Sequence, residues 1–326
     1  MKRIQIVSLL GSAALLCAAV TALAQAETFP NRPVRIVPFG VSGGVIDGIA
    51  RLYGEKLRER WKQPVLFESK PGASGTIAAD FVAKSPADGH TILFTLSLTH
   101  INNVVLQKGI PYDPVKDFEP LSQLATGAPA IIAPASAPFN DVRELVAYAK
   151  TKPDGVTYGT WGTGSGAHLM GELLARQTGA KLVHVPNKAE ATAHLDMLGG
   201  SLDFAWANPG SARNLLRSNK IKVLGLTGSR RIQALPSMPV MTEQGFKGFD
   251  LDGWVGAYAP AKTPKAILDE LSTALREITR MPDITARWID LGFEPLGNSP
   301  EDFARNHKAD YPRWAEIIKA AGVNPE

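Results

Sequence analysis

Two glycine-bearing segments carry the groups best suited to binding chemistry. The first, VRIVPFGVSGGVIDGIAR, spans Val34–Arg51 and reads as an apolar strand, a glycine-rich turn and an amphipathic helix. The second, VTYGTWGTGSGAHL, spans Val156–Leu169 and repeats that order. The first N–H groups of a helix lack partners within the helix, and the helix dipole is positive there, so each turn is a ready anion site. We therefore predict one anionic ligand held between two lobes.

The first turn combines glycines with two polar side chains. Gly43 and Gly44 permit positive φ and a close approach of the backbone to a ligand. Ser42 can cap the helix or donate its hydroxyl to a ligand oxygen. Asp47 falls in the first helical turn, where the dipole favours a carboxylate, and we interpret it as organising the loop or accepting from a ligand hydroxyl or water. The alternative is a tight strand-to-helix turn that binds nothing.

The second turn, Trp161–Ala167, fits two interpretations. Its GTGSGA stretch matches G-x-G-x-x-A, a dinucleotide-binding fingerprint. That fingerprint also needs an acidic residue at the end of the next strand for the ribose, and Val183–Asn187 carries none. We therefore favour a helix start whose N–H groups and side chains meet a carboxylate, with three contributors: Thr163, Gly164 and Ser165.

Polar side chains near other strand ends add candidates. Ser97 and Thr99 follow an expected strand at Thr91–Thr95, and Asn208 follows another strand. Ligands of open α/β sheets lie at the carboxyl ends of strands, so these three are either ligand donors or local caps. His168 comes just inside the second helix and is expected to pack and cap, with ligand contact as the alternative.

Aromatic residues stand at strand ends that should face the gap between lobes. Trp161, Trp206 and Trp254, together with Phe39, could wall an apolar slot for an aromatic or aliphatic ligand body. Ordinary core packing is the alternative for each. Since no Arg or Lys occurs in the two turns, dipoles, hydroxyls and ordered water would neutralise the ligand charge.

The chain starts with a pattern typical of export. Lys2 and Arg3 precede an apolar run over Ile4–Leu23, and Ala24-Gln25-Ala26 completes an A-x-A site. We expect residues 1–26 to be a cleaved signal peptide, which places the protein in a periplasm, and a retained membrane anchor is the alternative. The single cysteine, Cys17, lies inside this leader, so the mature chain has no disulfide, thiol nucleophile or thiolate metal site.

Composition excludes several classes of protein. Without Lys2 and Arg3 the net charge falls from +4 to +2, and no basic cluster with interleaved aromatics suggests nucleic acid. The motifs G-x-S-x-G, H-E-x-x-H and G-x-x-x-x-G-K-[ST] do not occur. The six histidines are scattered, so the sequence nominates neither a metal site nor a nucleophile with its base. We expect that the protein is not an enzyme and that it holds no cofactor.

Strand-like and helix-like segments alternate, which is typical of βαβ units with mainly parallel sheets. The mature length suits two domains. The expected strands are 34–38, 65–68, 91–95, 131–134, 156–159, 182–185, 204–206, 222–226 and 254–259. The expected helices are 45–61, 76–84, 142–150, 166–177, 188–198, 264–279, 283–291 and 300–321.

A series of motifs along the whole mature chain resembles a known family, the solute receptors of the tripartite tricarboxylate transporters, also called the Bug family of periplasmic binding proteins. The motifs occur in that family's order: VPFGVSGGVIDGIAR, SKPGASGT (69–76), ADGH (87–90), PYDPVKDF (111–118), Tyr158-Gly159 with Gly164 and His168, VHVP (183–186), Leu198-Gly199-Gly200 with Asp203, and Leu235-Pro236 with Pro239.

This resemblance implies an α/β fold of the type II periplasmic-binding kind, a Venus flytrap of two lobes. One lobe would hold residues 27–124 plus 251–326 and the other residues 125–250. Ligands of the family are mostly small carboxylates, which pass to a two-component membrane permease. We expect a monomer that closes by a hinge motion over one ligand, aromatic or dicarboxylate in type.

Three departures from the family pattern bear on the ligand rather than on the fold. The first turn has three residues between Phe39 and Gly43, where the family usually has two. Asn187 stands where a tyrosine is common, and Ala189-Glu190 stands where glycines are frequent. Two rival functions share the chain's features: a receptor that senses a ligand for a signalling protein, and an exported enzyme.

Overall fold

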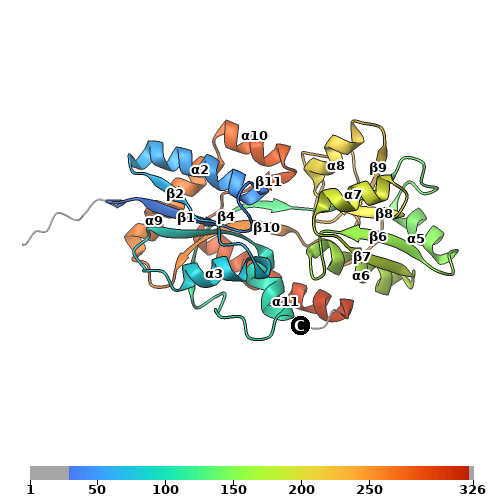
Figure 1. Ribbon diagram of the computed structural model, residues 1–326, viewed down its shortest axis with the longest axis horizontal. Coiled ribbons are helices and arrows are strands. Elements are labelled where there is room, and N and C mark those ends of the chain that lie inside the picture. Colours follow the sequence, from blue (N-terminus) through green and yellow to red (C-terminus); the bar gives the residue numbers. More distant parts are fainter. Residues whose placement is uncertain (1–28, 323–326) are drawn as a thin grey trace, which may run out of the picture.

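The computed structural model describes residues 29–322, so the expected signal peptide at residues 1–26 lies outside the described residues. Two β-sheets, each flanked by helices, form two lobes that lie side by side (Figure 1). Within the described part of the chain, no helix is both long enough and apolar enough to cross a membrane. The expected two-lobed α/β class is confirmed.

The first lobe is built on a six-stranded sheet in the order β11-β4-β10-β3-β1-β2. Its parallel part consists of β1 with β2 and β3 on either side, and β4, β10 and β11 join antiparallel. The strands are β1 (Val34–Pro38), β2 (Val65–Phe67), β3 (Thr91–Leu96), β4 (Phe118–Gly127), β10 (Gly253–Pro260) and β11 (Phe293–Pro295).

The second lobe is built on a five-stranded sheet in the order β7-β6-β8-β5-β9. Here β6 is parallel to β7 and β8, while β5 runs antiparallel to β8 and β9. The strands are β5 (Ala130–Pro134), β6 (Val156–Thr160), β7 (Leu182–Pro186), β8 (Phe204–Ala207) and β9 (Ile221–Leu226).

Helices cover both faces of each sheet (Figure 1). The first lobe has α2 (Val45–Trp61), η1 (Ala73–Gly75), α3 (Thr76–Ala83), η2 (Leu98–Asn102), α4 (Asn103–Leu106), α9 (Lys265–Thr279), α10 (Pro282–Asp290) and α11 (Pro300–Ala321). The second lobe has α5 (Val142–Lys150), α6 (Gly166–Thr178), α7 (Glu190–Leu198) and α8 (Pro209–Leu216).

Both sheets are mixed rather than mainly parallel, and the path between the lobes explains why. The chain leaves the first lobe along β4 and returns along β10, so these two neighbours run in opposite directions. We place the first crossing at Ala128–Pro129, because β4 still pairs with β10 and β11 at Gly127. The second crossing lies between β9 and β10, after Leu226 and before Gly253.

All of the predicted strands and helices are present, with ends that differ by at most two residues. The sequence reasoning missed β4, β11, η1, η2, α4 and α8. A proline inside a strand pattern argues against a strand, and β4 contains Pro120. The strand tolerates it because Pro120 lies opposite Tyr258, where the pairing with β10 shifts register at a bulge.

The parallel strands of both lobes end facing the gap between the lobes, and most of them feed a helix start there. In the first lobe β1 leads into α2, and β3 leads into η2. In the second lobe β6, β7 and β8 lead into α6, α7 and α8. The carboxyl ends of parallel strands thus gather several helix N-termini at one place, as in other open α/β sheets.

The carboxyl-terminal helix connects the cores of the two lobes. In Figure 1, α11 runs from beneath the first lobe toward α6 of the second. Trp314, Ile317 and Ile318 of α11 are buried in a hydrophobic cluster that also contains Leu169 and Met170 of α6. The lobes are therefore coupled by apolar contact as well as by the two crossings.

A buried hydrogen-bond chain fixes the helices of the first lobe to one another. The Tyr53 hydroxyl of α2 lies 2.7 Å from Thr279 Oγ1 of α9 and accepts the Trp288 Nε1–H of α10 at 3.0 Å. All three side chains are at most 1% exposed. Removing the hydroxyl would leave the indole N–H without an acceptor in an apolar surrounding.

We expect Tyr53→Phe to lower the free energy of unfolding by about 1–3 kcal/mol, the usual cost of an unsatisfied buried polar group. Urea unfolding measures this change. Tyr311→Phe, at a tyrosine that is 37% exposed, is the matched control and should change little. Equal effects of the two substitutions would contradict the stabilising role of the buried chain.

An acidic side chain at the second crossing couples stability to pH. Burial raises the pKa of Asp252 to about 6, a rise that Arg230 opposes and that Asp310, Asp250 and Glu294 reinforce. The folded state therefore binds this proton more tightly than the unfolded state does. The resulting destabilisation is present above the folded pKa and disappears as the pH falls through it.

We expect Asp252→Asn to raise the melting temperature near neutral pH, and the gain to shrink at about pH 4, where the carboxyl is protonated in the folded state. Thermal unfolding across that pH range measures the effect. Asp154→Asn, at an exposed position, is the control and should give no such trend. A gain independent of pH would rule out the burial of this carboxyl as its cause.

Candidate functional site

A cavity of about 520 Å³ lies between the two lobes, and residues of both lobes line it. From the first lobe it is lined by the start of α2, the end of β3 and η2; from the second lobe it is lined by the starts of α6, α7 and α8. Its volume suits a small organic ligand.

Four helix N-termini converge on this cavity. Val45 and Ile46 of α2, Gly166 of α6, Glu190 of α7 and Gly210 of α8 all line it. Among the described residues that line it, none is Lys, Arg or His. The positive potential in the cavity therefore comes from backbone N–H groups and helix dipoles, and it favours an anion.

The first turn is organised by Asp47. Its Oδ2 accepts the Gly43 N–H at 2.8 Å and Arg51 Nε–H at 2.9 Å. Burial raises the pKa of Asp47, but the hydrogen bonds from Arg51 and Gly43 outweigh it and hold the pKa below its usual range. Gly43 has a φ of 82°, a conformation that glycine adopts without strain.

The two backbone N–H groups that the sequence predicts to be free for a ligand are already hydrogen-bonded within the turn. Gly43 donates to Asp47, and Gly44 donates to the Val41 carbonyl at 3.1 Å. The next two N–H groups, those of Val45 and Ile46, stand in the first turn of α2, where a helix offers no internal acceptor. The N–H groups of this turn that stay available to an acceptor are therefore those of Val45 and Ile46 rather than those of Gly43 and Gly44.

The second turn is also held by hydrogen bonds between its own backbone and nearby side chains. Ser165 caps α6, since its Oγ accepts the His168 N–H at 3.3 Å and donates to the Gly162 carbonyl at 2.7 Å. Gly164, with a φ of 74°, donates its N–H to His168 Nδ1 at 3.0 Å. His168 thus packs and caps, and the N–H of Gly166 stays in the unpaired first turn of α6.

His168 belongs to a neutral pair beneath this turn. Its ring stacks on that of His184 with centroids 3.9 Å apart. Burial lowers the pKa of His168, against the attraction of Glu172. Burial and then the neighbouring His168 lower the pKa of His184 to about 4. The pair supports the turn and supplies no positive charge to the cavity at neutral pH.

Several buried polar atoms in the cavity wall have no hydrogen-bond partner among the described residues. Such atoms are rare in folded proteins and indicate where a polar partner belongs. They are Asn102 Oδ1, Thr227 Oγ1, Trp254 Nε1 and Trp314 Nε1.

The rest of the wall is mostly apolar. Phe39, Trp161 and Trp254 line the cavity as expected. Trp206 does not; it is fully buried in the core of the second lobe, which is the packing alternative. Phe293 and Trp314, from the returning part of the chain, add two further rings to the wall. A hydrocarbon body would fit between these rings.

The structure places half of the predicted site residues on the cavity. Phe39, Gly44, Ser97, Trp161, Ser165, Asn208 and Trp254 line it. Ser42, Gly43, Asp47, Thr99, Thr163, Gly164 and His168 do not. Ligand contact stays a prediction for all fourteen residues, although the Gly44 N–H is taken by the Val41 carbonyl.

Thr99 has a clear local role instead. It is fully buried, and its hydroxyl lies 2.6 Å from Thr95 Oγ1, 2.9 Å from the Leu96 carbonyl and 2.9 Å from His100 Nδ1. This is the local-cap alternative. Thr163 is exposed and does not line the cavity.

Sequence reasoning missed eight polar or aromatic residues that line the cavity: Asn102, Glu190, Ser211, Asn214, Thr227, Asp290, Phe293 and Trp314. A usable signal existed for one of them. Glu190 follows β7, a parallel strand beside β6, and begins the next helix, so the strand-end rule applied to it as well as to Asn208. The other seven come from η2, α8, the second crossing and the elements from α10 to α11, whose positions depend on the tertiary structure.

The lobes also touch beside the cavity, where α8 meets the end of α10. Arg213 Nη2 donates to Asp290 Oδ1 at 3.0 Å and to the Asp290 carbonyl at 3.1 Å. Gly210 lies against the backbone of this end: a Cβ built on it would come within 2.6 Å of the Leu291 carbonyl carbon. The close approach of the two lobes therefore requires a glycine at this position.

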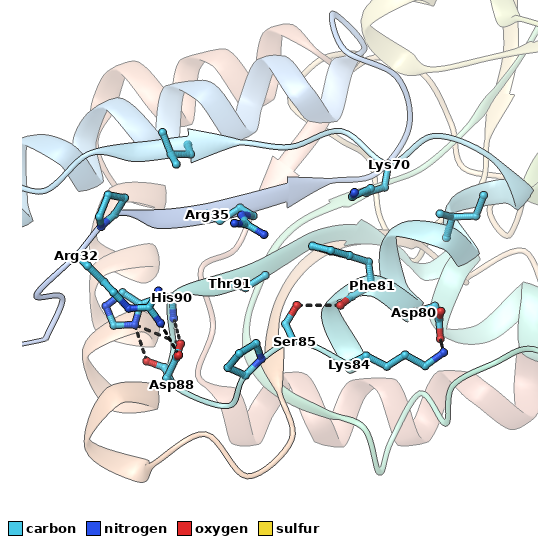
Figure 2. A pocket seen from close by; sticks show the side chains of 14 residues that line it. Arg32, Arg35, Lys70, Asp80, Phe81, Lys84, Ser85, Asp88, His90 and Thr91 are labelled. Carbon is cyan, nitrogen blue, oxygen red and sulfur yellow. Dashed lines mark hydrogen bonds and ion pairs between the residues drawn. The ribbon is translucent and has the colours of Figure 1, made fainter.

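A second cavity, of about 810 Å³, lies on the first lobe beside β1, β2, β3 and α3 (Figure 2). Four cationic side chains line it, but each has a carboxylate partner: Arg32 with Asp88, Arg35 and Lys70 with Glu68, and Lys84 with Asp80. Three carboxylates thus offset three of the four positive charges, and only residues of the first lobe line this cavity. We therefore take the interlobe cavity as the functional site.

Comparisons with known proteins point to one family. The family model for the tripartite tricarboxylate transporter family receptor matches residues 49–323. Protein BugT of Bordetella pertussis is 30% identical, over 94% of this chain and 94% of its own.

Solved structures of similar proteins include receptors with bound carboxylates. A protein of R. palustris solved with adipate is 32% identical, with a TM-score of 0.81 over 91% of this chain and 100% of that one. MatC of Rhodopseudomonas palustris with bound malate is 30% identical, with a TM-score of 0.75 over 89% and 100%. Periplasmic binding protein BugD is 34% identical, with a TM-score of 0.77 over 91% and 100%.

We expect Gly210→Ala to keep the lobes apart, because the added methyl group meets backbone atoms of Asp290 and Leu291 that cannot swing away. Small-angle X-ray scattering should show a larger radius of gyration. Gly48→Ala is the matched control, a helical glycine whose Cβ would meet nothing within 4 Å. An unchanged radius in both variants would contradict the steric role of Gly210.

Proposed function

The chain belongs to the tripartite tricarboxylate transporter receptor family, and on this basis we propose that it is an exported periplasmic receptor that closes over one small carboxylate. The proposal includes delivery of that carboxylate to a two-component membrane permease. Members of this family are solute-binding proteins, and the similar solved structures are binding proteins as well.

One observation carries the proposal: four helix N-termini surround an interlobe cavity, and none of the described residues that line it is cationic. Backbone N–H groups at helix starts bind carboxylate oxygens directly, and the helix dipoles favour the negative charge. Binding that needs groups from both lobes also links ligand capture to closure, because only the closed form brings α2 and α6 to the same anion.

The wall of the cavity supports a ligand with a hydrocarbon body. Rings of Phe39, Trp161 and Phe293 line it beside Val41 and Val45, which are 61% and 49% exposed. Exposed apolar side chains of this kind gain from contact with an apolar ligand body. Adipate and malate, in the two similar R. palustris proteins, are small carboxylates of suitable size.

Gly166 offers a direct test of the anion site. It is the first residue of α6, it lines the cavity, and a Cβ on it would make only an ordinary contact, at 3.6 Å from the Trp314 ring. We expect Gly166→Leu to fold normally and to weaken carboxylate binding at least about tenfold, since the leucine covers the N–H groups of α6. Isothermal titration calorimetry with the carboxylates that stabilise the wild type measures the change.

Gly48→Leu is the control for this substitution, because Gly48 lies on the exposed side of α2 away from the cavity. It should leave affinity unchanged. Full carboxylate affinity in Gly166→Leu, with a melting temperature equal to that of the control, would refute the proposed binding site.

A further inference from the structure

One of the four helix starts at the cavity carries a carboxylate of the chain itself. Glu190 is the first residue of α7 and lines the cavity. Its Oε1 accepts the Asn208 N–H at 2.8 Å, and its Oε2 accepts the Asn208 side-chain N–H at 2.6 Å. Glu190 therefore takes the position, between the starts of α7 and α8, that a ligand carboxylate could otherwise take.

No strong cation balances this carboxylate. Within residues 29–322, the ion pairs of Glu190 include no Lys or Arg, and the basic group nearest to it is His194 Nε2, 3.6 Å from Oε1. The same nitrogen lies 3.2 Å from the Trp206 carbonyl, which is a suitable acceptor for its proton. The side chain of Glu190 is only 18% exposed, so water screens its charge weakly.

The other acidic residue of the cavity differs on each of these points. Asp290 is paired with Arg213 at 3.0 Å, and its side chain is 63% exposed. Its charge is neutralised by a neighbour and screened by solvent. Glu190 is therefore the source of uncompensated negative charge in the cavity.

Building on the proposed function, we infer that Glu190 substitutes for a second ligand carboxylate and selects a monocarboxylate whose far end carries a hydrogen-bond donor. An ammonium group fits best and a hydroxyl group second. A carboxylate oxygen can accept more than one hydrogen bond, and Asn208 donates only one to each oxygen of Glu190. The Asn208 side-chain oxygen is a further acceptor at the same place.

The remaining helix starts accommodate the ligand carboxylate. The first-turn N–H groups of α2 and α6, at Val45, Ile46 and Gly166, face the same cavity without a carboxylate of the chain beside them. A ligand with its carboxylate there and its donor at Glu190 satisfies both ends. A dicarboxylate would instead place two like charges together at Glu190, which is unfavourable in a partly buried site.

Four six-carbon compounds of matched length test the inference: 6-aminohexanoate, 6-hydroxyhexanoate, hexanoate and adipate. All four have a carboxylate at one end, and only the group at the far end differs: an ammonium, a hydroxyl, a methyl or a second carboxylate. For the wild type, calorimetry should give an affinity order that begins with the amine, continues with the hydroxyl and the methyl, and ends with the dicarboxylate. This order needs no variant, so it is informative even if a substitution disturbs folding.

Glu190→Gln then assigns the selectivity to one side chain. We expect the ratio of the adipate dissociation constant to the 6-aminohexanoate dissociation constant to fall at least about tenfold. The reason is that the substitution removes the negative charge of Glu190, which faces the far end of the ligand. Glu144→Gln is the matched control: Glu144 lies in the first turn of α5, outside the cavity lining, and its Oε2 accepts both the N–H and the side-chain N–H of Asn140. It should leave the ratio unchanged.

The outcomes separate this inference from the proposed function. Binding of all four compounds with equal affinity, or a ratio that Glu190→Gln does not change, overturns the role of Glu190 and leaves carboxylate binding standing. Binding of none of the four, together with no response to shorter or aromatic carboxylates, overturns both. The predicted order with a lowered ratio supports both.

Discussion

Unpaired N–H groups at helix starts are the constraint on which this protein depends. Every α-helix leaves them, and a fold must satisfy them with caps, water or a ligand. Here the parallel strands of two lobes place four such starts around one cavity, and over residues 29–322 its lining includes no Lys, Arg or His. The fold thus gathers unpaired hydrogen-bond donors at the cavity between the lobes, where each of them needs an acceptor.

Side chains of the chain itself accept hydrogen bonds from several of these N–H groups. The N–H groups that stay unpaired determine which ligand can bind. Asp47 takes the Gly43 N–H, Ser165 and His168 close the second turn, and Glu190 takes the N–H groups of Asn208. What is left for a ligand is the set of first-turn N–H groups of α2 and α6. Small differences in such internal acceptors would allow one fold to bind carboxylates of different length and polarity without a change in architecture.

The fold could be predicted closely because its elements are encoded locally. Alternating apolar strands and amphipathic helices, with glycine turns between them, fix α2, α5 and α6 almost to the residue. β4 was missed because a central proline is a strong local signal against a strand, and only the bulged pairing with β10 overrides it.

The site was predicted less well, since it depends on tertiary closure. The turns were located correctly, but which N–H groups remain free depends on Asp47 and His168, whose side chains fold back onto their own loops. Trp314 reaches the cavity from α11, far away in sequence, because that helix packs against α6. Glu190 is the exception. The rule that ligands lie at the carboxyl ends of parallel strands, already applied to Asn208, also predicts it.

The indole rings around the cavity make the protein its own optical probe. Trp161, Trp254 and Trp314 line the space that a ligand would fill, and they come from the second lobe, the returning strand and the connecting helix. Any occupant that changes the polarity beside them, or shifts α11 against α6, should alter intrinsic tryptophan fluorescence. Emission spectra would therefore follow occupancy in real time without a label.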